Sequence, residues 1–348
     1  MNLKRVCVCG HFGFGENLLN GQTVKTKIVT SAIKRSVGSG QVVKLDTAGG
    51  MRANWLLPFR LLSTMRRCKN IVMLPAENGL RILTPLISFY NRIFHRATHY
   101  VVVGGWLPAF ISGKKSMIRR LKRFTGIYVE TQSMMDALTD LGFGNVYLMP
   151  NCKELKLLTE KELVYERAEP YRLCTFTRVM KEKGISDAIE AVRSVNVSLG
   201  RTAFTLDVYG QIGQEQKKWF HRLQKRFPEY VMYGGVVPYN KSVEVLKDYF
   251  AVLFPTYYEG EGFAGTIIDA HSAGVPIIAS DWKYNHEIVR DGVDGAIVPP
   301  RDVPALHNKL LEILDAPEKW NAMKVACLER AAGYMPNKAI GVLLDKLL

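Results

Sequence analysis

The sequence has few of the features that mark secreted, metal-binding or membrane-spanning proteins. Its six cysteines are scattered without a C-x-x-C pair, and its seven histidines are dispersed. Neither a zinc site nor a disulfide framework is supported, and a reducing cytoplasm is the expected compartment. No apolar run approaches the roughly 20 residues of a membrane span, and the run at residues 6–9 is too short for a signal-peptide core. We expect a protein that is soluble or peripheral to a membrane.

Acidic residues are scarce in the first half of the chain. Residues 1–155 contain 22 lysines and arginines against 7 acidic residues, and this excess equals the net charge of +15 of the whole protein. Such asymmetry implies an anionic partner for the first half, which is membrane lipid, a pyrophosphate-linked acceptor or nucleic acid. A non-enzymatic nucleic-acid-binding protein is suggested by charge alone, because the sequence has no RNP, zinc-finger or helix-turn-helix signature.

The 348 residues exceed one typical core and suggest two domains of roughly 150 to 200 residues. Short apolar runs alternate with helical patterns in both halves. The expected strands of the first half are residues 5–9, 42–45, 71–74, 100–103, 127–130 and 146–149. Those of the second half are residues 172–176, 206–209, 231–233, 252–254, 277–279 and 296–298. This repetition predicts an α/β protein with a doubly wound, mostly parallel sheet in each domain.

Residues 255–281 place two carboxylates after a buried strand. Glu261 lies in a glycine-rich loop, and Asp269 lies in the first turn of a short helix that Gly274 is expected to end. Thr266 is a candidate N-cap, and Thr266-x-x-Asp269 is typical of a capping box. Because ligands of open α/β sheets bind at the carboxyl ends of the strands, this arrangement predicts a site.

Two motifs in the second half resemble a known family. Glu261 and Asp269, eight residues apart and flanked by Pro255, Gly-Phe and Gly-x-Pro, resemble the Glu-x7-Glu signature of family 4 (GT4) retaining glycosyltransferases. Residues 175–185, with Arg178 and a Glu-Lys183-Gly turn, resemble the same family. Here the second acid is Asp, one methylene shorter than Glu. Glu259 lies nearby, but Ile267 stands eight residues beyond it, so Glu261 fits the spacing better.

The resemblance implies the GT-B fold, in which two Rossmann-like doubly wound domains face each other across a cleft. It covers residues 172–300 clearly and the first half more weakly. We expect an acceptor-binding domain at 1–155 and a nucleotide-sugar-binding domain at 156–334. A C-terminal helix within 335–348 is expected to pack on the first domain, as it does in GT-B enzymes.

The resemblance also implies roles for individual residues. Arg178 and Lys183 would hold the donor diphosphate and, with helix-start amides, stabilise the charge of the leaving group without a metal. Glu261 would accept hydrogen bonds from the donor sugar. The sequence contains no Asp-x-Asp, so we expect no metal and no cofactor beyond the nucleotide sugar.

Other positions keep two interpretations. The amides of Gly262, Phe263 and Ala264 would approach sugar or phosphate in an otherwise ordinary loop. Asp269 either binds ribose or caps its helix.

In the first domain, Gly13 and Gly15 either bring amides against a phosphate or sugar or form a structural turn. Residues 114–124 carry six cations with interleaved apolar residues. They are either an interfacial amphipathic helix or a helix packed on the core.

The function that the resemblance implies is that of a retaining, metal-independent glycosyltransferase of the kind that assembles bacterial polysaccharides. The donor would be a nucleoside-diphosphate sugar, with UDP favoured by family frequency. The acceptor would be a glycan or a polyprenyl-diphosphate-linked oligosaccharide at the cytoplasmic face of the membrane, where the basic first domain meets anionic lipid. A sugar-nucleotide 2-epimerase of the same architecture is the alternative enzyme.

Overall fold

The computed structural model describes residues 4–13, 21–47, 55–165 and 168–348. The chain divides into two compact units. Unit 1 comprises Met1–Lys153 and Met335–Leu348, and unit 2 comprises Glu154–Tyr334. The first division lies next to the boundary expected at 155/156, and the second coincides with the expected start of the C-terminal segment.

Unit 1 contains a six-stranded parallel sheet in the order β2-β1-β3-β4-β5-β6. Its strands are β1 (Lys4–Gly10), β2 (Val42–Asp46), β3 (Cys68–Leu74), β4 (Ala97–Val101), β5 (Gly126–Val129) and β6 (Val146–Leu148). The helices between them are α1 (Gly21–Val37), α3 (Leu57–Arg67), α4 (Glu77–Phe94), α5 (Leu107–Ile111), α6 (Lys115–Leu121) and α7 (Gln132–Asp140). The strands are short apolar runs because helices bury both faces of a parallel sheet.

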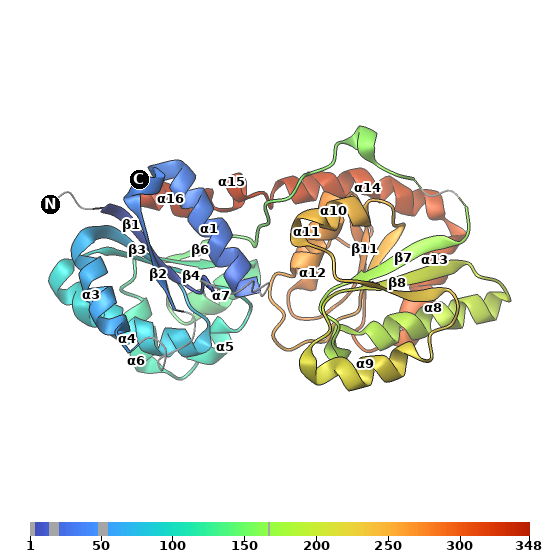
Figure 1. Ribbon diagram of the computed structural model, residues 1–348, viewed down its shortest axis with the longest axis horizontal. Helices are drawn as coiled ribbons and strands as arrows, with labels where there is room; N and C mark the ends of the chain where they lie inside the picture. The colour runs from blue at the N-terminus through green and yellow to red at the C-terminus, as the bar shows by residue number, and fades with distance from the viewer. Residues whose placement is uncertain (1–3, 14–20, 48–54, 166–167) are drawn as a thin grey trace. The chain divides into compact units, whose positions relative to one another are not determined.

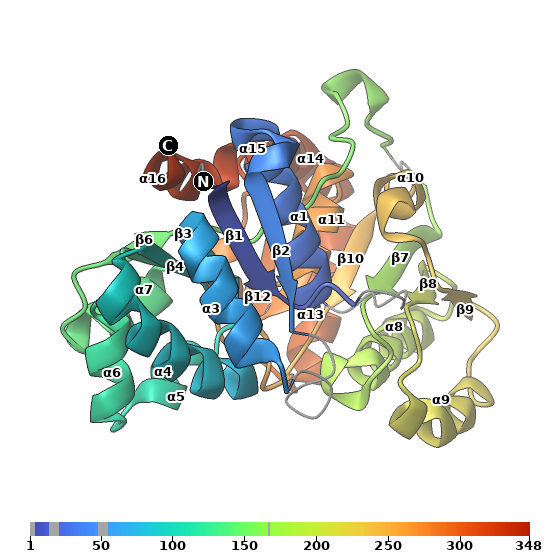
Figure 2. The same ribbon diagram turned by 60° about the vertical axis from the view of Figure 1, so that its left-hand side comes forward.

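The C-terminal helices belong to unit 1. After the end of unit 2 the chain forms α15 (Pro336–Ala339) and α16 (Gly341–Leu347). Leu343 and Leu347 lie in the same hydrophobic cluster as Val6 and Val8 of β1 and Ile33 of α1. Helix α15 lies beside α1 in both views (Figures 1 and 2). Two short helices therefore stand where the sequence predicted one, and they complete one face of the unit 1 core.

Unit 2 repeats this architecture with the strand order β12-β11-β10-β7-β8-β9. Its strands are β7 (Tyr171–Phe176), β8 (Phe204–Tyr209), β9 (Val231–Gly235), β10 (Ala251–Phe254), β11 (Ile277–Ser280) and β12 (Gly295–Val298). Its helices are α8 (Ile185–Leu199), α9 (Lys217–Gln224), α10 (Ser242–Leu246), α11 (Gly265–Ser272), α12 (Asn285–Ile288), α13 (Val303–Asp315) and α14 (Pro317–Ala332). All the strand pairings are parallel.

Side chains of the central strand β7 alternate between two cores. Leu173 packs in the cluster that contains residues of α8 and α13, and the next residue, Cys174, packs in the cluster that contains residues of α10 and α11. This period of two is that of a strand covered on both faces. The predicted doubly wound α/β fold is therefore confirmed.

Each sheet reverses its direction of growth once. From β1 the chain adds β2 on one side and then returns to add β3 on the other, and from β7 it adds β8 and β9 before it returns to β10. The loops that leave the carboxyl ends of the two strands at such a reversal diverge to opposite faces of the sheet and leave a crevice, where open α/β folds bind ligands. These positions are β1/β3 in unit 1 and β7/β10 in unit 2.

The structure decides between the two interpretations of residues 114–124. Helix α6 covers Lys115–Leu121, and the apolar side chains of Met117, Leu121 and Phe124 are buried in unit 1. The interfacial interpretation of these apolar side chains is therefore wrong, because the core already covers them. Within the described ranges, none of the helices combines the length and the apolar character that a membrane crossing needs.

His271 of α11 is a packing residue. It is fully buried, and its Nε2 lies 3.2 Å from the backbone oxygen of Asp294. Burial lowers the pKa of His271 to about 4, and the carboxylate of Asp294 opposes this only in part. The imidazole is therefore neutral in the folded protein at neutral pH.

Acidification should destabilise unit 2 through His271. The unfolded chain takes up the proton first, so this contribution to stability is complete above pH 6.5 and is lost as the pH falls toward 4. Between pH 7 and pH 5 the wild type should lose about 2 kcal/mol more unfolding free energy than His271→Gln. Urea denaturation at the two pH values measures this difference, and equal losses in the two proteins would contradict it.

Candidate functional site

The candidate site of unit 2 is built by two loops at the β7/β10 reversal. The first loop follows β7 and leads through the 3-10 turn η3 (Lys181–Lys183) into α8. The second comprises residues 255–264 and leads from β10 into α11. Because β7 and β10 are hydrogen-bonded neighbours, their carboxyl ends, and the loops that start there, lie side by side.

A buried ion pair joins the two loops. The ammonium of Lys183 lies 2.5 Å from Oε2 of Glu261, and both side chains are almost completely buried. Thr256 Oγ1 donates a second hydrogen bond to the same carboxylate oxygen over 2.9 Å. Two donors on one oxygen fix the orientation of the Glu261 carboxylate.

The backbones of the two loops also meet. The amide of Tyr257 donates to the carbonyl of Glu182 over 2.8 Å. Gly184 has φ +70°, and a Cβ there would lie 2.0 Å from the carbonyl oxygen of Pro255. A side chain at this position would push the loops apart, so glycine is needed for both its conformation and its size.

Burial lowers the pKa of Lys183, since a charged ammonium is poorly solvated in the interior. The negative charge and hydrogen bond of Glu261 oppose this shift, and the positive charge of Arg178 adds to it.

Arg178 lies close to the pair but remains exposed. Its guanidinium carbon is 5.4 Å from the centre of the Tyr258 ring, and the ammonium of Lys183 is 4.9 Å from the same centre. Trp282 Nε1 donates to the Tyr258 carbonyl over 2.8 Å, which holds this loop against the end of β11. The structure thus brings Arg178, Lys183 and Glu261 together, two of them buried and one accessible.

Asp269 does not cap its helix. Helix α11 begins at Gly265 with Ala264 as the N-cap residue, and no side-chain capping bond is present. Thr266 lies inside the first turn and donates to the carbonyl of Phe176 over 2.8 Å. The predicted Thr266 N-cap and its capping box are therefore wrong, because the helix starts earlier and Thr266 bonds to the end of β7.

The Asp269 carboxylate instead accepts a hydrogen bond from Ser242 Oγ of α10 over 2.8 Å, and it is 3% exposed. Gly274 ends the helix with φ +63°, as predicted. The ribose role of Asp269 stays a prediction.

The residues that follow Glu261 differ in exposure. Gly262 is half-buried, whereas the Phe263 ring is buried and packs edge-on against Tyr334 with 4.9 Å between ring centres. Ala264 is buried and begins α11. Phe263 thus anchors the loop through its side chain, and binding by the three amides stays a prediction.

The β1/β3 reversal of unit 1 contains a hollow of about 280 Å³. Its lining residues are His11, Gln22, Thr47, Leu57, Pro75, Ala76, Asn78, Gly79, Ile82 and Leu83. Most of this lining is apolar, which distinguishes the hollow from the charged site of unit 2.

The glycine-rich loop after β1 is only partly described. Gly13 is buried with φ +60°, whereas Gly15 lies outside the described residues. The amide of Phe12 donates to Asp46 Oδ1 over 2.9 Å, so the acid at the end of β2 holds this loop in place. The roles of both glycines stay predictions.

Sequence reasoning missed a second buried ion pair, in unit 1. The ammonium of Lys25 on α1 bonds to Glu130, which directly follows β5 and also accepts from the amide of Gly104 over 3.3 Å. The two residues are 105 positions apart. The available signals were a lysine among the threonines and aliphatic residues of α1 and an acid immediately after a buried strand.

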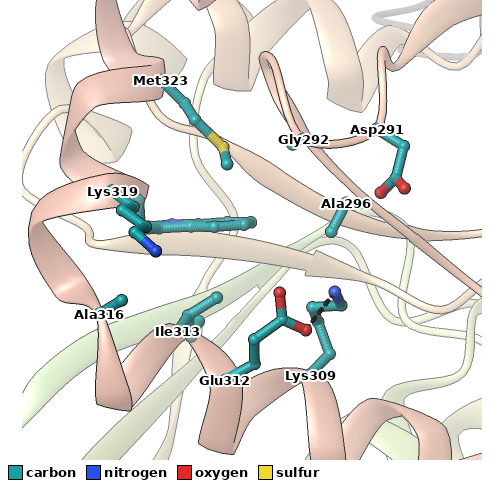
Figure 3. A pocket seen from close by; sticks show the side chains of 11 residues that line it. Asp291, Gly292, Ala296, Lys309, Glu312, Ile313, Ala316, Lys319 and Met323 are labelled. Atoms are coloured by element: carbon teal, nitrogen blue, oxygen red, sulfur yellow. Dashed lines mark hydrogen bonds and ion pairs between the residues drawn. The ribbon is translucent and has the colours of Figure 1, made fainter.

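Another hollow, of about 230 Å³, lies at the opposite end of the unit 2 sheet (Figure 3). Lys309, Glu312 and Ile313 of α13 line one side of it, and Lys319 and Met323 of α14 line another. Gly295 and Ala296, which start β12, place it at the amino ends of the strands. None of the site residues predicted from the sequence lines this hollow.

The site segment matches a known family. Residues 160–327 match the family model of glycosyl transferases group 1. The match includes Arg178, Lys183, Glu261 and Asp269, and it lies within unit 2.

Curated relatives align over part of their length. The UDP-N-acetylglucosamine–peptide N-acetylglucosaminyltransferase GtfA subunit of Streptococcus agalactiae is 29% identical over 160 residues, which are 46% of this chain and 29% of the relative. The amylovoran biosynthesis glycosyltransferase AmsK of Erwinia amylovora is 26% identical over 149 residues, which are 42% of this chain and 36% of the relative. The aligned part of this chain thus spans less than half the length of each.

Solved structures resemble the whole chain in fold. Anabaena Alr3699/HepE in complex with UDP has a TM-score of 0.77 at 13% identity, with 99% of both chains covered. The sucrose-phosphate synthase of Thermosynechococcus elongatus has a TM-score of 0.73 at 14% identity and covers 98% of this chain and 97% of its own. These neighbours are GT-B glycosyltransferases, so the predicted GT-B fold is confirmed.

The Lys183–Glu261 pair should show strong energetic coupling. Lys183→Met leaves a carboxylate buried without its cation, which should cost about 3 kcal/mol of unfolding free energy. In the double variant Lys183→Met/Glu261→Gln the loss should be smaller than the sum of the single losses by more than about 1 kcal/mol. Urea denaturation of the full chain gives the unfolding free energies of the wild type, the two single variants and the double variant.

The exposed pair Lys283–Glu259, 2.8 Å apart near the same loop, is the matched control. Its coupling should stay below about 1 kcal/mol because water screens both charges. Additive losses at Lys183 and Glu261 would show that the buried pair does not hold the loops together.

Proposed function

We propose that this chain, a homologue of group 1 glycosyltransferases, transfers a sugar from UDP to a glycan or a lipid-linked oligosaccharide with retention of configuration. The observation that carries the proposal is the joint placement of Arg178, Lys183 and Glu261 at the β7/β10 reversal. The donor site lies in unit 2. As a GT4-like enzyme, the chain serves polysaccharide assembly.

The two cations have different tasks at the donor diphosphate. Exposed Arg178 binds phosphate oxygens through its planar guanidinium, and its charge follows the leaving group as the bond breaks. Buried Lys183 is held by Glu261 and supplies a positive charge that needs little reorganisation. The amino terminus of α8, which starts directly after Gly184, adds its partial positive charge.

Glu261 recognises the donor sugar. Its Oε2 is taken up by Lys183 and Thr256, so sugar hydroxyls approach the rest of the carboxylate. The amides of Gly262, Phe263 and Ala264 contact sugar or phosphate, and those of Gly13 and Gly15 take the same role in unit 1. Asp269 accepts from a ribose hydroxyl and shares its oxygens with Ser242.

A UDP donor is supported by the proteins that resemble this chain. The Streptococcus relative is named for UDP-N-acetylglucosamine, and the Anabaena neighbour was solved with UDP and with UDP-glucose. Arg178 and Lys183 supply the charge that a metal would otherwise provide, so the proposed transfer needs no metal and no further cofactor.

The reaction proceeds on one face of the sugar. The bond between the anomeric carbon and the phosphate oxygen breaks, and the acceptor oxygen bonds to the same face of that carbon. The leaving phosphate oxygen takes the acceptor proton. This route needs no enzymic nucleophile, which suits a Glu261 carboxylate tied by two donors and an Asp269 carboxylate that is nearly fully buried.

The acceptor binds in unit 1, whose hollow at the β1/β3 reversal has an apolar lining with a few polar groups. An acceptor that carries a polyprenyl diphosphate stays in the lipid bilayer, so the enzyme works as a peripheral protein at the cytoplasmic membrane face. The charge excess of unit 1 supports an anionic membrane, and not nucleic acid, as its partner.

Loss of either site residue should abolish most transfer. Glu261→Ala and Arg178→Ala should each lower kcat on the order of a hundredfold or more while the fold remains intact. Glu259→Ala is the matched control, since Glu259 lies in the same loop, is exposed and should leave kcat nearly unchanged. Transfer from UDP-sugars to lipid-linked acceptors is measured, with the anomeric configuration of the product read by NMR.

Near-normal transfer by both site variants, or an inverted product, would contradict this assignment. The same incubation without acceptor separates the alternative enzyme class, because a 2-epimerase changes the UDP-sugar on its own.

UDP should stabilise the protein without a metal. At one hundred times its dissociation constant a ligand adds about 2.7 kcal/mol, which raises Tm by roughly 5–10 °C for a unit of this size. Thermal unfolding in excess EDTA with UDP, GDP or ADP measures this shift. A larger shift with GDP or ADP would reassign the base, and a shift that one divalent ion restores after EDTA would show that a metal is needed.

A further inference from the structure

Four large apolar side chains of unit 1 are exposed to solvent, one in the turn before α3 and three on the helices α3 and α4. Trp55, just before α3, is 71% exposed and Phe59 of α3 is 66% exposed. Phe89 and Ile93 of α4 are 59% and 66% exposed. We call these four residues the α3–α4 face.

The four side chains do not contribute to the hydrophobic core of unit 1. Phe89 and Ile93 are four residues apart in α4, which places both on the same side of that helix, and Trp55 lies in the turn that precedes α3. Other residues of the same helices supply the buried side, including Leu61 and Met65 of α3 and Ile87 of α4. Single exposed apolar residues are ordinary, but a group on adjoining helices marks an interaction surface.

The charge around this face is almost entirely positive. Residues 55–123 contain 13 lysines and arginines and a single acid, Glu77, which pairs with Arg81 over 2.6 Å. Arg60 and Arg66 of α3 and Arg92 of α4 are exposed. Helices α3, α4 and α6 lie side by side in both views (Figures 1 and 2), and α6 also carries exposed cations.

We infer that the α3–α4 face docks on a lipid bilayer with anionic headgroups. Exposed aromatic side chains on helices that also carry exposed arginines suit the boundary between headgroups and acyl chains, where the apolar groups enter and the cations meet lipid phosphates. A second copy of this chain is a poor occupant, because it would bring the same excess of cations against itself. An anionic bilayer, in contrast, accommodates both the apolar side chains and the cations of this surface.

Helix α9 of unit 2 shows what cations alone provide. It also carries exposed cations, among them Arg222, and the segment after it adds Lys225 and Arg226. Its large apolar residue Phe220 is fully buried, and Trp219 packs against the unit 2 core. This basic surface lacks exposed aromatic groups and serves as an internal control.

The biological meaning of the α3–α4 face rests on the proposed function, because a membrane-bound acceptor requires an enzyme at the membrane. Vesicle binding is measured without donor or acceptor, so it fails or succeeds independently of transfer.

The experiment is co-sedimentation of the full chain with phosphatidylcholine vesicles that contain about one third phosphatidylglycerol. The apolar variant combines Trp55→Ser, Phe59→Ser, Phe89→Ser and Ile93→Ser. Its partition coefficient should fall by at least about tenfold, since each lost side chain removes apolar area from the interface. The side chains are exposed, so unfolding should be unaffected, and circular dichroism checks this.

The matched apolar control removes equally exposed residues of unit 2, namely Val197→Ser, Met232→Ser and Val236→Ser. This variant should bind like the wild type. The charge variant Arg60→Glu/Arg66→Glu/Arg67→Glu should bind more weakly by about fivefold for each cation. Its control in α9 and the segment directly after it, Arg222→Glu/Lys225→Glu/Arg226→Glu, should change binding much less.

Several results would overturn the inference. Equal binding by the wild type and the apolar variant would exclude insertion, and equal binding to pure phosphatidylcholine would exclude the anionic requirement. Absence of wild-type binding would refute the membrane as the occupant. If ultracentrifugation then showed a dimer that the apolar variant lacks, the occupant would be a second copy of this chain.

Discussion

The ion pair between Lys183 and Glu261 is the contact on which the geometry of the donor side depends. It joins residues 78 positions apart in loops that leave neighbouring strands. Two charges in the interior lose most of their hydration, and this arrangement compensates for the loss with the Thr256 hydroxyl and with two aromatic ring faces near the ammonium. The loops are therefore set in one arrangement before any ligand arrives, while Arg178 stays outside the pair and accessible.

Both sheets reverse their direction of growth once, but they differ in the residues that they place at the reversal. In unit 2 the crevice between β7 and β10 holds cations and carboxylates. In unit 1 the corresponding place holds an apolar hollow with His11, Gln22 and Asn78 among its lining residues. The fold supplies the position in both units, and the loop residues decide what kind of molecule fits. This difference matches a division between a charged donor and a bulkier acceptor.

Much of the architecture was predictable because buried parallel strands are short continuous apolar runs between turn residues. The Gly-Phe context and the spacing to Asp269 favoured Glu261 over its exposed neighbour Glu259. The start of α11 was not predictable, since Thr266 has an ordinary capping sequence but bonds to a strand end 90 positions away. The sequence left two interpretations of residues 114–124 open, because cations interleaved with apolar groups have the same pattern in a membrane-bound helix and in a helix packed on a core. The pairing of Lys25 with Glu130 depends on tertiary contacts that no local pattern records.

The return of the chain to unit 1 has a consequence for biosynthesis. Residues 335–348 supply Leu343 and Leu347 to the core beside Val6 and Val8, but a ribosome makes them only after all of unit 2. The nascent first unit therefore waits with an uncovered apolar face while the second unit already possesses its whole sequence. The order of completion is the reverse of the order of synthesis. Chaperones that shield apolar surface would accordingly act on unit 1 for longer than on unit 2.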